Sequence, residues 1–279
     1  MSLKIAITYD GHGSGLANYA NFQSAVAEAV ALLEGAFVAP NITIPITVDW
    51  GYIDGQPFSG LGESESFYTT FTYSTLLSTL QTLASGQSAS ANFKKMVTNL
   101  PAASPGVFWA TVAQAQAWGL GGASVSGYCG FGATNNYTYT RQFGIAAGTY
   151  DLVGVICHEL TEVMGRQGFL GQNYLELGAA CQIADLLAYS SAGVSTWNSY
   201  GGYFSIDGGT TNLKNWWVNN TYDGRDWHGN DAPTNDSFNA FSSSGVLNAV
   251  SDVDYILIDC MGYPPNYAGA DPLVTQGAG

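Results

Sequence analysis

The chain has 279 residues, of which 21 are Asp or Glu and only 7 are Lys or Arg, giving a formal net charge of −14. Charged residues make up 10% of the chain, against about a quarter in ordinary soluble domains. The shortage of basic residues argues against a nucleic-acid partner, because phosphates require Lys and Arg. The hydrophobic share of 46% is too high for disorder, and no run reaches the roughly 18 apolar residues of a membrane span.

The first fifty residues predict a β-α-β unit. A strand is expected over residues 4–9, an amphipathic helix over 17–37, and a second strand over 42–48, where apolar and polar residues alternate. Such a unit favours two parallel strands joined by a right-handed crossover. The glycine loop after the first strand lacks the third glycine of a dinucleotide fingerprint, so we disfavour that cofactor.

The middle of the chain mixes short strands and helices, and ends in one strong helical pattern. Residues 51–72 are rich in Gly, Ser and aromatic residues and predict loops and an edge strand. The further elements expected are helices over 73–84, 92–100, 113–118 and 150–166 and strands over 107–111 and 126–132.

The last third is mostly irregular, with many Gly, Asn, Ser and aromatic residues. A hairpin turn is expected at 205–209. The last helix is expected over 251–261, with Ser251 as its N-cap and Gly262 at its end. Residues 266–279 predict a polar tail. The four cysteines form no CxxC pair, which favours buried free thiols over a thiolate metal site.

The helix expected between Tyr150 and Arg166 carries the clearest functional pattern. Drawn at 100° per residue, it has an apolar arc wide enough to be buried. His158 and Glu162 project from the opposite seam, one turn apart, and Glu159 lies on the flank beside them. These three side chains are therefore expected to face a common space.

The three residues form a variant of the HExxH metal-binding pattern, with Glu in place of the second His. Two ligands at i and i+4 can bind one ion, and the Glu after the first ligand can act as the general base. Carboxylates bind zinc at about 2.0–2.2 Å, although their charge makes the ion a weaker Lewis acid. The simpler interpretation is an exposed His/Glu contact. The chain has 3 His and 21 acidic residues. By chance, a His followed by acidic residues at both the first and the fourth position after it is expected about 0.02 times in such a chain.

The segment from Tyr150 to Arg166 resembles the active-site helix of a bacterial family of zincin-like metalloproteases, and more widely that of metzincins such as serralysins and matrixins. Segments 184–190, 203–213 and 250–263 strengthen the resemblance, which covers most of residues 1–265 in the order of elements. Only the helix of His158 is a specific motif.

The resemblance implies an α+β fold: a zincin-like domain over residues 1–265, with a mixed sheet and the active-site helix along the floor of a cleft. The N-terminal lobe would span about 1–166 and the C-terminal lobe about 167–265. It also implies a zinc-dependent endopeptidase that acts on a protein or peptide substrate. His158 and Glu162 would bind Zn²⁺, and Glu159 would be the general base.

The chain departs from the family at two ligand positions. Metzincins have histidines where this chain has Glu162 and Gly168, and Gly168 has no side chain to offer. Asp185 is our first candidate for the third ligand, although Asp is as often a helix cap. His228 is the second candidate, although a lone loop histidine is seldom a ligand. His12 ranks lower.

Supporting residues are harder to choose. Tyr189 or Tyr203 could stabilise a developing oxyanion, but the chain has 17 tyrosines. Arg166 is expected to neutralise Glu162, Asp185 or another buried acid, unless it forms only a surface ion pair. An acidic loop makes Ca²⁺ a second metal candidate, although it lacks EF-hand spacing. Its members are Asp223, Asp226, Asp231 and Asp236.

Two other functions stay open. The two missing histidines favour a catalytically inactive zincin-fold protein that binds a partner, and paired carboxylates would also suit a nonpeptidase hydrolase. No apolar segment at the N-terminus is long enough for a secretory signal. With the family resemblance, this predicts secretion without a classical signal peptide, and a cytoplasmic location is the alternative.

Overall fold

The computed structural model describes residues 3–39, 41–86, 88–102, 106–231 and 234–266. Helices and several small sheets alternate along the chain, which confirms the α+β class. The polar tail predicted over 266–279 lies, apart from Asn266, outside the described residues.

The largest sheet has four strands in the order β1-β2-β8-β5. The first three are parallel, and β5 pairs antiparallel with β8 at one edge. The β-α-β unit is confirmed, because α1 joins the parallel neighbours β1 and β2. The edge strand predicted within residues 51–72 is β5. The strands are β1 (Lys4–Tyr9), β2 (Thr43–Trp50), β5 (Gly62–Ser66) and β8 (Gly127–Phe131).

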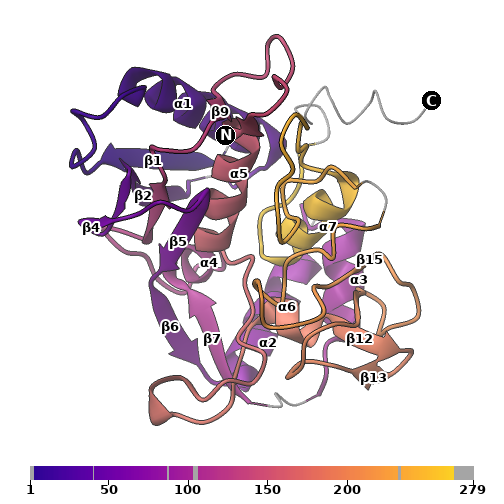
Figure 1. The fold of residues 1–279 in the computed structure, drawn as a ribbon. Helices are drawn as coiled ribbons and strands as arrows, with labels where there is room; N and C mark the ends of the chain where they lie inside the picture. The colour runs from indigo at the N-terminus through magenta and orange to yellow at the C-terminus, as the bar shows by residue number, and fades with distance from the viewer. Residues whose placement is uncertain (1–2, 40, 87, 103–105, 232–233, 267–279) are drawn as a thin grey trace.

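Two helices, α1 (Tyr19–Ala36) and α5 (Leu152–Val163), pack against each other, and α5 also contacts β5 and β8. Figure 1 shows α5 passing through the middle of the molecule. It is shorter than predicted at both ends. Asp151 forms its N-cap by accepting the N–H of Gly154 at 3.1 Å, and beyond its end Gly165 has a φ of 118° that favours glycine.

The remaining strands form small sheets around this centre. The strand predicted at 107–111 is β7, which lies between β6 and β11. The turn predicted at 205–209 lies in the loop that joins β14 to β15. The strands are β3 (Tyr52–Ile53), β4 (Gln56–Pro57), β6 (Tyr68–Phe71), β7 (Val107–Thr111), β9 (Tyr137–Thr138), β10 (Tyr150–Asp151), β11 (Ala180–Cys181), β12 (Ala188–Ser191), β13 (Val194–Ser195), β14 (Tyr203–Phe204) and β15 (Lys214–Asn215).

The other predicted helices, which are α1, α2, α3, α4 and α7, begin and end within two residues of their predicted bounds. Ser251 caps α7 as expected, in a capping box with Asp254. One hydrophobic core includes buried residues from Leu3 to Tyr263, so the N-terminal and C-terminal parts share an interior. The helices are α2 (Tyr73–Ser85), α3 (Ala91–Asn99), α4 (Val112–Ala117), the 3₁₀ turn η1 (Tyr174–Glu176), α6 (Ile183–Leu186) and α7 (Asp252–Cys260).

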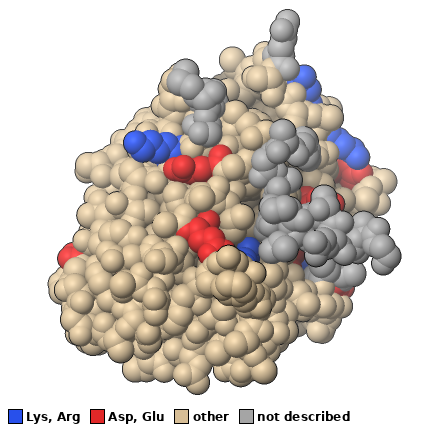
Figure 2. Space-filling model, turned by 90° about the horizontal axis from the view of Figure 1, so that it is seen from above, with Lys and Arg blue, Asp and Glu red and all other residues tan. Residues whose placement is uncertain are grey.

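The surface matches the composition. Figure 2 shows few and scattered charged side chains on the face it presents. All four cysteines are buried and free, as predicted. In the part of the chain that the structure describes, no helix is long and apolar enough to cross a membrane.

Asp259 on α7 is a buried carboxyl group that gives the fold a pH-dependent stability. Burial raises its pKa to about 6, although hydrogen bonds from Ser90 Oγ and the Phe93 N–H oppose the shift. The pKa of this group is about 4 in the unfolded chain. Between about pH 4 and pH 6 the folded state therefore binds more protons than the unfolded state, and its stability falls as the pH rises. We expect Asp259→Asn to raise the free energy of unfolding by on the order of 2 kcal/mol above about pH 7, with a smaller gain near pH 5. Urea unfolding at both pH values tests this, and an equal gain at both would contradict it.

Candidate metal centre

His158, Glu159 and Glu162 of α5 line one side of a cleft of about 790 Å³. β5 and the residue before it form another wall through Leu61–Ser64, and the C-terminal third of the chain adds residues 221–223 and 239–242. The predicted division of the helix into two faces is therefore confirmed. α5 buries its apolar arc, and its other face turns these three side chains toward a common space.

The imidazole of His158 is held in one orientation. Its Nδ1 lies 2.7 Å from the backbone carbonyl oxygen of Ser237, which can only accept a hydrogen bond. Nδ1 therefore carries the hydrogen and donates, which leaves Nε2 as the ring atom that can bind a metal. Nε2 lies 3.4 Å from Glu162 Oε1 and 3.6 Å from Asp226 Oδ1.

Asp226 is the third residue of this cluster, and it comes from the loop after β15. The neighbouring Trp227 fixes its place. The indole of Trp227 is fully buried, stacks on Trp216 with ring centroids 4.5 Å apart, and donates from Nε1 to Asp254 Oδ1 on α7 at 2.6 Å. The backbone N–H of Trp217 also donates to the Asp226 carbonyl oxygen at 2.8 Å.

The three donors fit a divalent metal such as zinc. Imidazole nitrogen and carboxylate oxygen are both zinc ligands, and two ligands of a tetrahedral ion lie about 3.4 Å apart. The observed separations of 3.4 and 3.6 Å match that spacing. In addition, Glu162 Oε1 is buried and accepts no hydrogen bond of good geometry from the described residues, and its cationic neighbours are Arg166 Nη2 at 3.3 Å and His158 Nε2 at 3.4 Å. A metal ion that replaces the His158 proton would keep this buried oxygen next to a cation.

Arg166 supplies positive charge to the same cluster. Its fully buried guanidinium lies 2.5 Å from Asp226 Oδ1 through Nη1 and 3.3 Å from Glu162 Oε1 through Nη2. It also donates to Thr161 Oγ1 and to the His158 carbonyl oxygen. The prediction that Arg166 neutralises Glu162 or another buried acid is therefore confirmed, and the surface ion pair is excluded.

The charges in the cluster strongly influence one another. Burial and Arg166 lower the pKa of His158, but Asp226 and Glu162 outweigh both and raise it to about 10. Burial raises the pKa of Glu162, but His158, Arg166 and Ser64 outweigh burial and lower it to about 2. Without a metal, His158 is therefore the second cation of a buried ion-pair network. A metal that binds Nε2 has to replace this proton.

Glu159 differs from its neighbours because its carboxylate is not engaged. It accepts no hydrogen bond within the described part of the chain, and it lines the cleft. Burial and then the charge of Glu162 raise its pKa. This direction suits a group that accepts a proton near neutral pH. The backbone of β5 passes so close at Gly62 that a Cβ there would collide with Glu159 Oε1.

Glu162 is oriented by side chains from β5, β6 and the loop after α5. Ser64 Oγ donates to Glu162 Oε2 at 2.7 Å, and Gln167 Nε2 donates to Ser64 Oγ at 3.1 Å. The Tyr68 hydroxyl donates in turn to Gln167 Oε1. This chain of hydrogen bonds leaves Oε1 as the Glu162 oxygen that faces His158, as expected for a carboxylate ligand with a supporting shell.

The structure does not bring Asp185 to the cluster. Its carboxylate accepts the N–H groups of Phe169, Leu170 and Gln182 and pairs with Arg225 Nε at 2.9 Å. It acts as the buried N3 acid of the capping box of α6, so the helix-cap interpretation describes it.

His228 is also outside the cluster, although it follows Asp226 by only two residues. Its ring packs against Trp217, with centroids 5.7 Å apart, and the backbone N–H of His228 donates to the carbonyl oxygen of Asn215. The ring of His228 is not among the converging donor atoms and does not line the cleft, whereas Asp226 does both.

The two tyrosines proposed for oxyanion support lie elsewhere. Tyr189 and Tyr203 pair with each other across β12 and β14, and the Tyr203 hydroxyl donates to the Gly209 carbonyl oxygen at 2.6 Å. The tyrosines that line the cleft are Tyr150 and Tyr222. Their sequence surroundings gave no signal that distinguishes them from the other fifteen.

The four aspartates considered for calcium do not converge. Asp226 belongs to the His158 cluster, whereas Asp236 forms a buried ion pair with Lys214 Nζ at 2.7 Å. Asp231 Oδ2 accepts the N–H of Asn215, and Asp223 lies exposed at the cleft. Among the described residues, these four carboxylates therefore form no common cluster, and calcium binding stays a prediction from the sequence.

Comparison of the chain with protein-family models, with curated proteins and with solved structures found no match. The cleft combines a His/Glu pair on a buried helix with an Asp from the loop after β15, beside an unengaged glutamate.

Proposed function

We propose that the protein is a zinc-dependent endopeptidase with a zincin-like, two-lobed fold. The single observation that carries the proposal is the convergence of His158 Nε2, Glu162 Oε1 and Asp226 Oδ1 beside the unengaged Glu159. His158 and Glu162 keep the roles predicted from the sequence, and Asp226 takes the place proposed for Asp185.

The residues of the chain divide the work of hydrolysis. His158, Glu162 and Asp226 would hold the zinc ion, which when bound lowers the pKa of a water molecule and polarises a carbonyl group. Glu159 accepts the proton of the attacking water on its carboxylate and passes it to the leaving amine. Arg166 keeps the two ligand carboxylates in place, because its guanidinium is within 3.3 Å of both.

The shape of the cleft favours an extended peptide as substrate. β5 is an edge strand along the cleft, and an unpaired edge can bind an extended chain through backbone hydrogen bonds. Tyr222 and Phe241 line the same cleft, and their exposed side chains cluster with Trp217, with ring centroids 5.1 to 6.3 Å apart. Aromatic rings of this kind contribute apolar contact area for substrate side chains.

Zinc content and peptide cleavage, measured together, test the proposal. We expect the chain to bind zinc at the His158 cluster, to cleave casein, and to lose cleavage after chelation. His158→Ala should abolish both zinc at this cluster and cleavage. His228→Ala is the matched control, because it removes a nearby histidine that lies outside the cluster, and it should change neither. Equal zinc content in the two variants would contradict the proposal.

A second candidate is a zincin-fold protein that binds a partner without catalysis. It is favoured by the 2.5 Å contact between Arg166 Nη1 and Asp226 Oδ1, because a guanidinium there already neutralises a proposed ligand. Zinc binding without cleavage would favour this candidate. A nonpeptidase hydrolase and secretion without a classical signal stay predictions from the sequence.

A further inference from the structure

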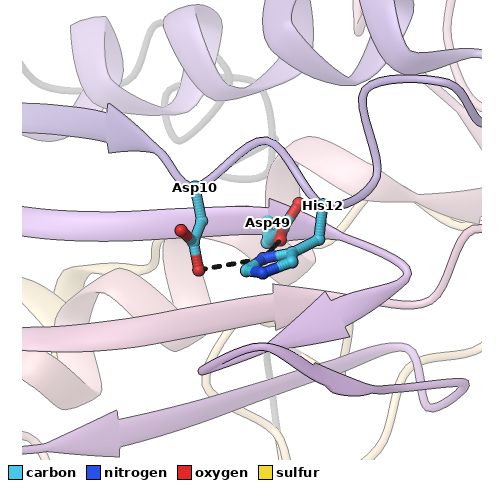
Figure 3. Close-up of side chains that lie close together, drawn as sticks. All are labelled: Asp10, His12 and Asp49. Carbon is cyan, nitrogen blue, oxygen red and sulfur yellow. Dashed lines mark hydrogen bonds and ion pairs between the residues drawn. The ribbon is translucent and has the colours of Figure 1, made fainter.

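We propose a second divalent-cation site, formed by Asp10, His12 and Asp49 and separate from the His158 cluster. Asp10 follows the end of β1, His12 lies in the loop after it, and Asp49 is near the end of β2. Because β1 and β2 are parallel neighbours, their carboxyl ends meet at one edge of the sheet, and Figure 3 shows the three side chains turned toward one another there.

The spacing of the donor atoms fits a bound ion. His12 Nδ1 lies 3.0 Å from Asp49 Oδ2 and 3.1 Å from Asp10 Oδ2, and the three atoms lie within 4.8 Å of one another. Two ligands at right angles around a six-coordinate ion, each about 2.1 Å from it, are about 3.0 Å apart, which agrees with both distances. Tetrahedral zinc places its ligands about 3.4 Å apart, so zinc would bind after a movement of about 0.3–0.4 Å.

Hydrogen bonding alone does not satisfy this arrangement. A single ring nitrogen carries at most one hydrogen, so Nδ1 can donate well to only one of the two carboxylates that it faces. Among the described residues, Asp10 and Asp49 have no ion-pair partner except His12. Two carboxylates and one imidazole therefore share a site that has a deficit of positive charge, which a divalent cation would correct.

Asp49 is preorganised as a ligand. Its side chain is only 2% exposed, and its Oδ1 accepts the N–H groups of Gly13 at 3.1 Å and Trp50 at 2.8 Å. These two bonds leave Oδ2 directed at His12. Among the described residues, His12 is the one ion-pair partner of this buried carboxylate, and a metal ion at Oδ2 would compensate its burial further.

Access and ligand chemistry indicate the kind of ion. The side chains of Asp10 and His12 are 33% and 46% exposed, so an ion can enter from solvent and keep bound water. An imidazole with two carboxylates favours zinc or another first-row transition metal over calcium or magnesium, which prefer oxygen ligands only. The ion would fasten the loop of residues 10–15 to β2 and thereby stabilise this edge of the sheet.

Calorimetric titration of zinc chloride into the chelator-treated full-length chain tests the site. In a His158→Ala background, which removes the first cluster, we expect one zinc equivalent to remain. Adding His12→Ala should abolish it, and Asp10→Asn, at an exposed position, should weaken it at least about tenfold. The zinc-induced rise in melting temperature should fall in parallel.

The control is His228→Ala in the same His158→Ala background, which should keep the remaining zinc equivalent. The proposal is overturned if the background chain binds no zinc, or if adding His12→Ala leaves its zinc affinity unchanged. The result also separates the two sites. A wild-type chain whose one zinc depends on His12 and not on His158 would support this site and contradict the proposed peptidase.

Discussion

Glu159→Gln is expected to reduce peptide hydrolysis by about 10²–10⁴-fold, the usual contribution of a general base. Gln keeps the size and shape of the side chain but cannot accept the proton of the attacking water. Because Glu159 accepts no hydrogen bond from the described residues and is not among the three converging donors, its replacement should leave the zinc content unchanged. Initial rates on a fluorogenic peptide, with zinc measured on the same samples, give both values.

Glu63→Gln is the matched control. Glu63 lies on β5, lines the same cleft and is exposed, so the substitution removes an equal charge from the same space without removing the proposed base. Its effect on the rate should be small. A Glu159→Gln protein as active as the Glu63→Gln protein would exclude Glu159 as the base, whatever the metal content.

The helix of the site could be predicted because its signal is local. Its apolar arc has the helical period, and residues at i and i+4 must share a face. The two ends of α5 were less certain, because they depend on a pairing of β10 with β9 and on the backbone of Gly165. Neither the pairing nor the backbone angle has a periodic pattern in the sequence.

The third donor could not be predicted with the same method. Asp226 follows Glu162 by 64 residues and lies in irregular chain, where no period relates it to α5. Its place depends on the burial of Trp227 and on the bond from that indole to Asp254, which are long-range contacts. The one available signal was the sequence Asp226-Trp227, an acid beside a large apolar residue that had to be buried. Asp185 had an equally good local pattern, and that pattern described a helix cap.

Substitution of Arg166 distinguishes a cluster that binds a metal from one that is only an ion-pair network. Arg166→Met removes the buried charge and keeps an apolar chain against the ring of Phe238, over which the guanidinium now lies at 4.4 Å. Without metal, the carboxylates of Glu162 and Asp226 would lose a cation, and we expect a loss of about 3–5 kcal/mol in the free energy of unfolding. Urea unfolding in chelator measures this loss.

Added zinc should then restore part of the loss. An ion that binds the folded state alone stabilises it, and it binds more tightly when no guanidinium repels it. The rise in unfolding free energy on adding zinc should therefore be larger for Arg166→Met than for the wild type. Arg141→Met is the control, since Arg141 pairs with Asp151 in a buried site outside the cluster, and its loss should not be restored beyond the wild-type gain. If zinc stabilises neither the wild type nor Arg166→Met, the cluster is an ion-pair network and the inactive binding protein becomes the better interpretation.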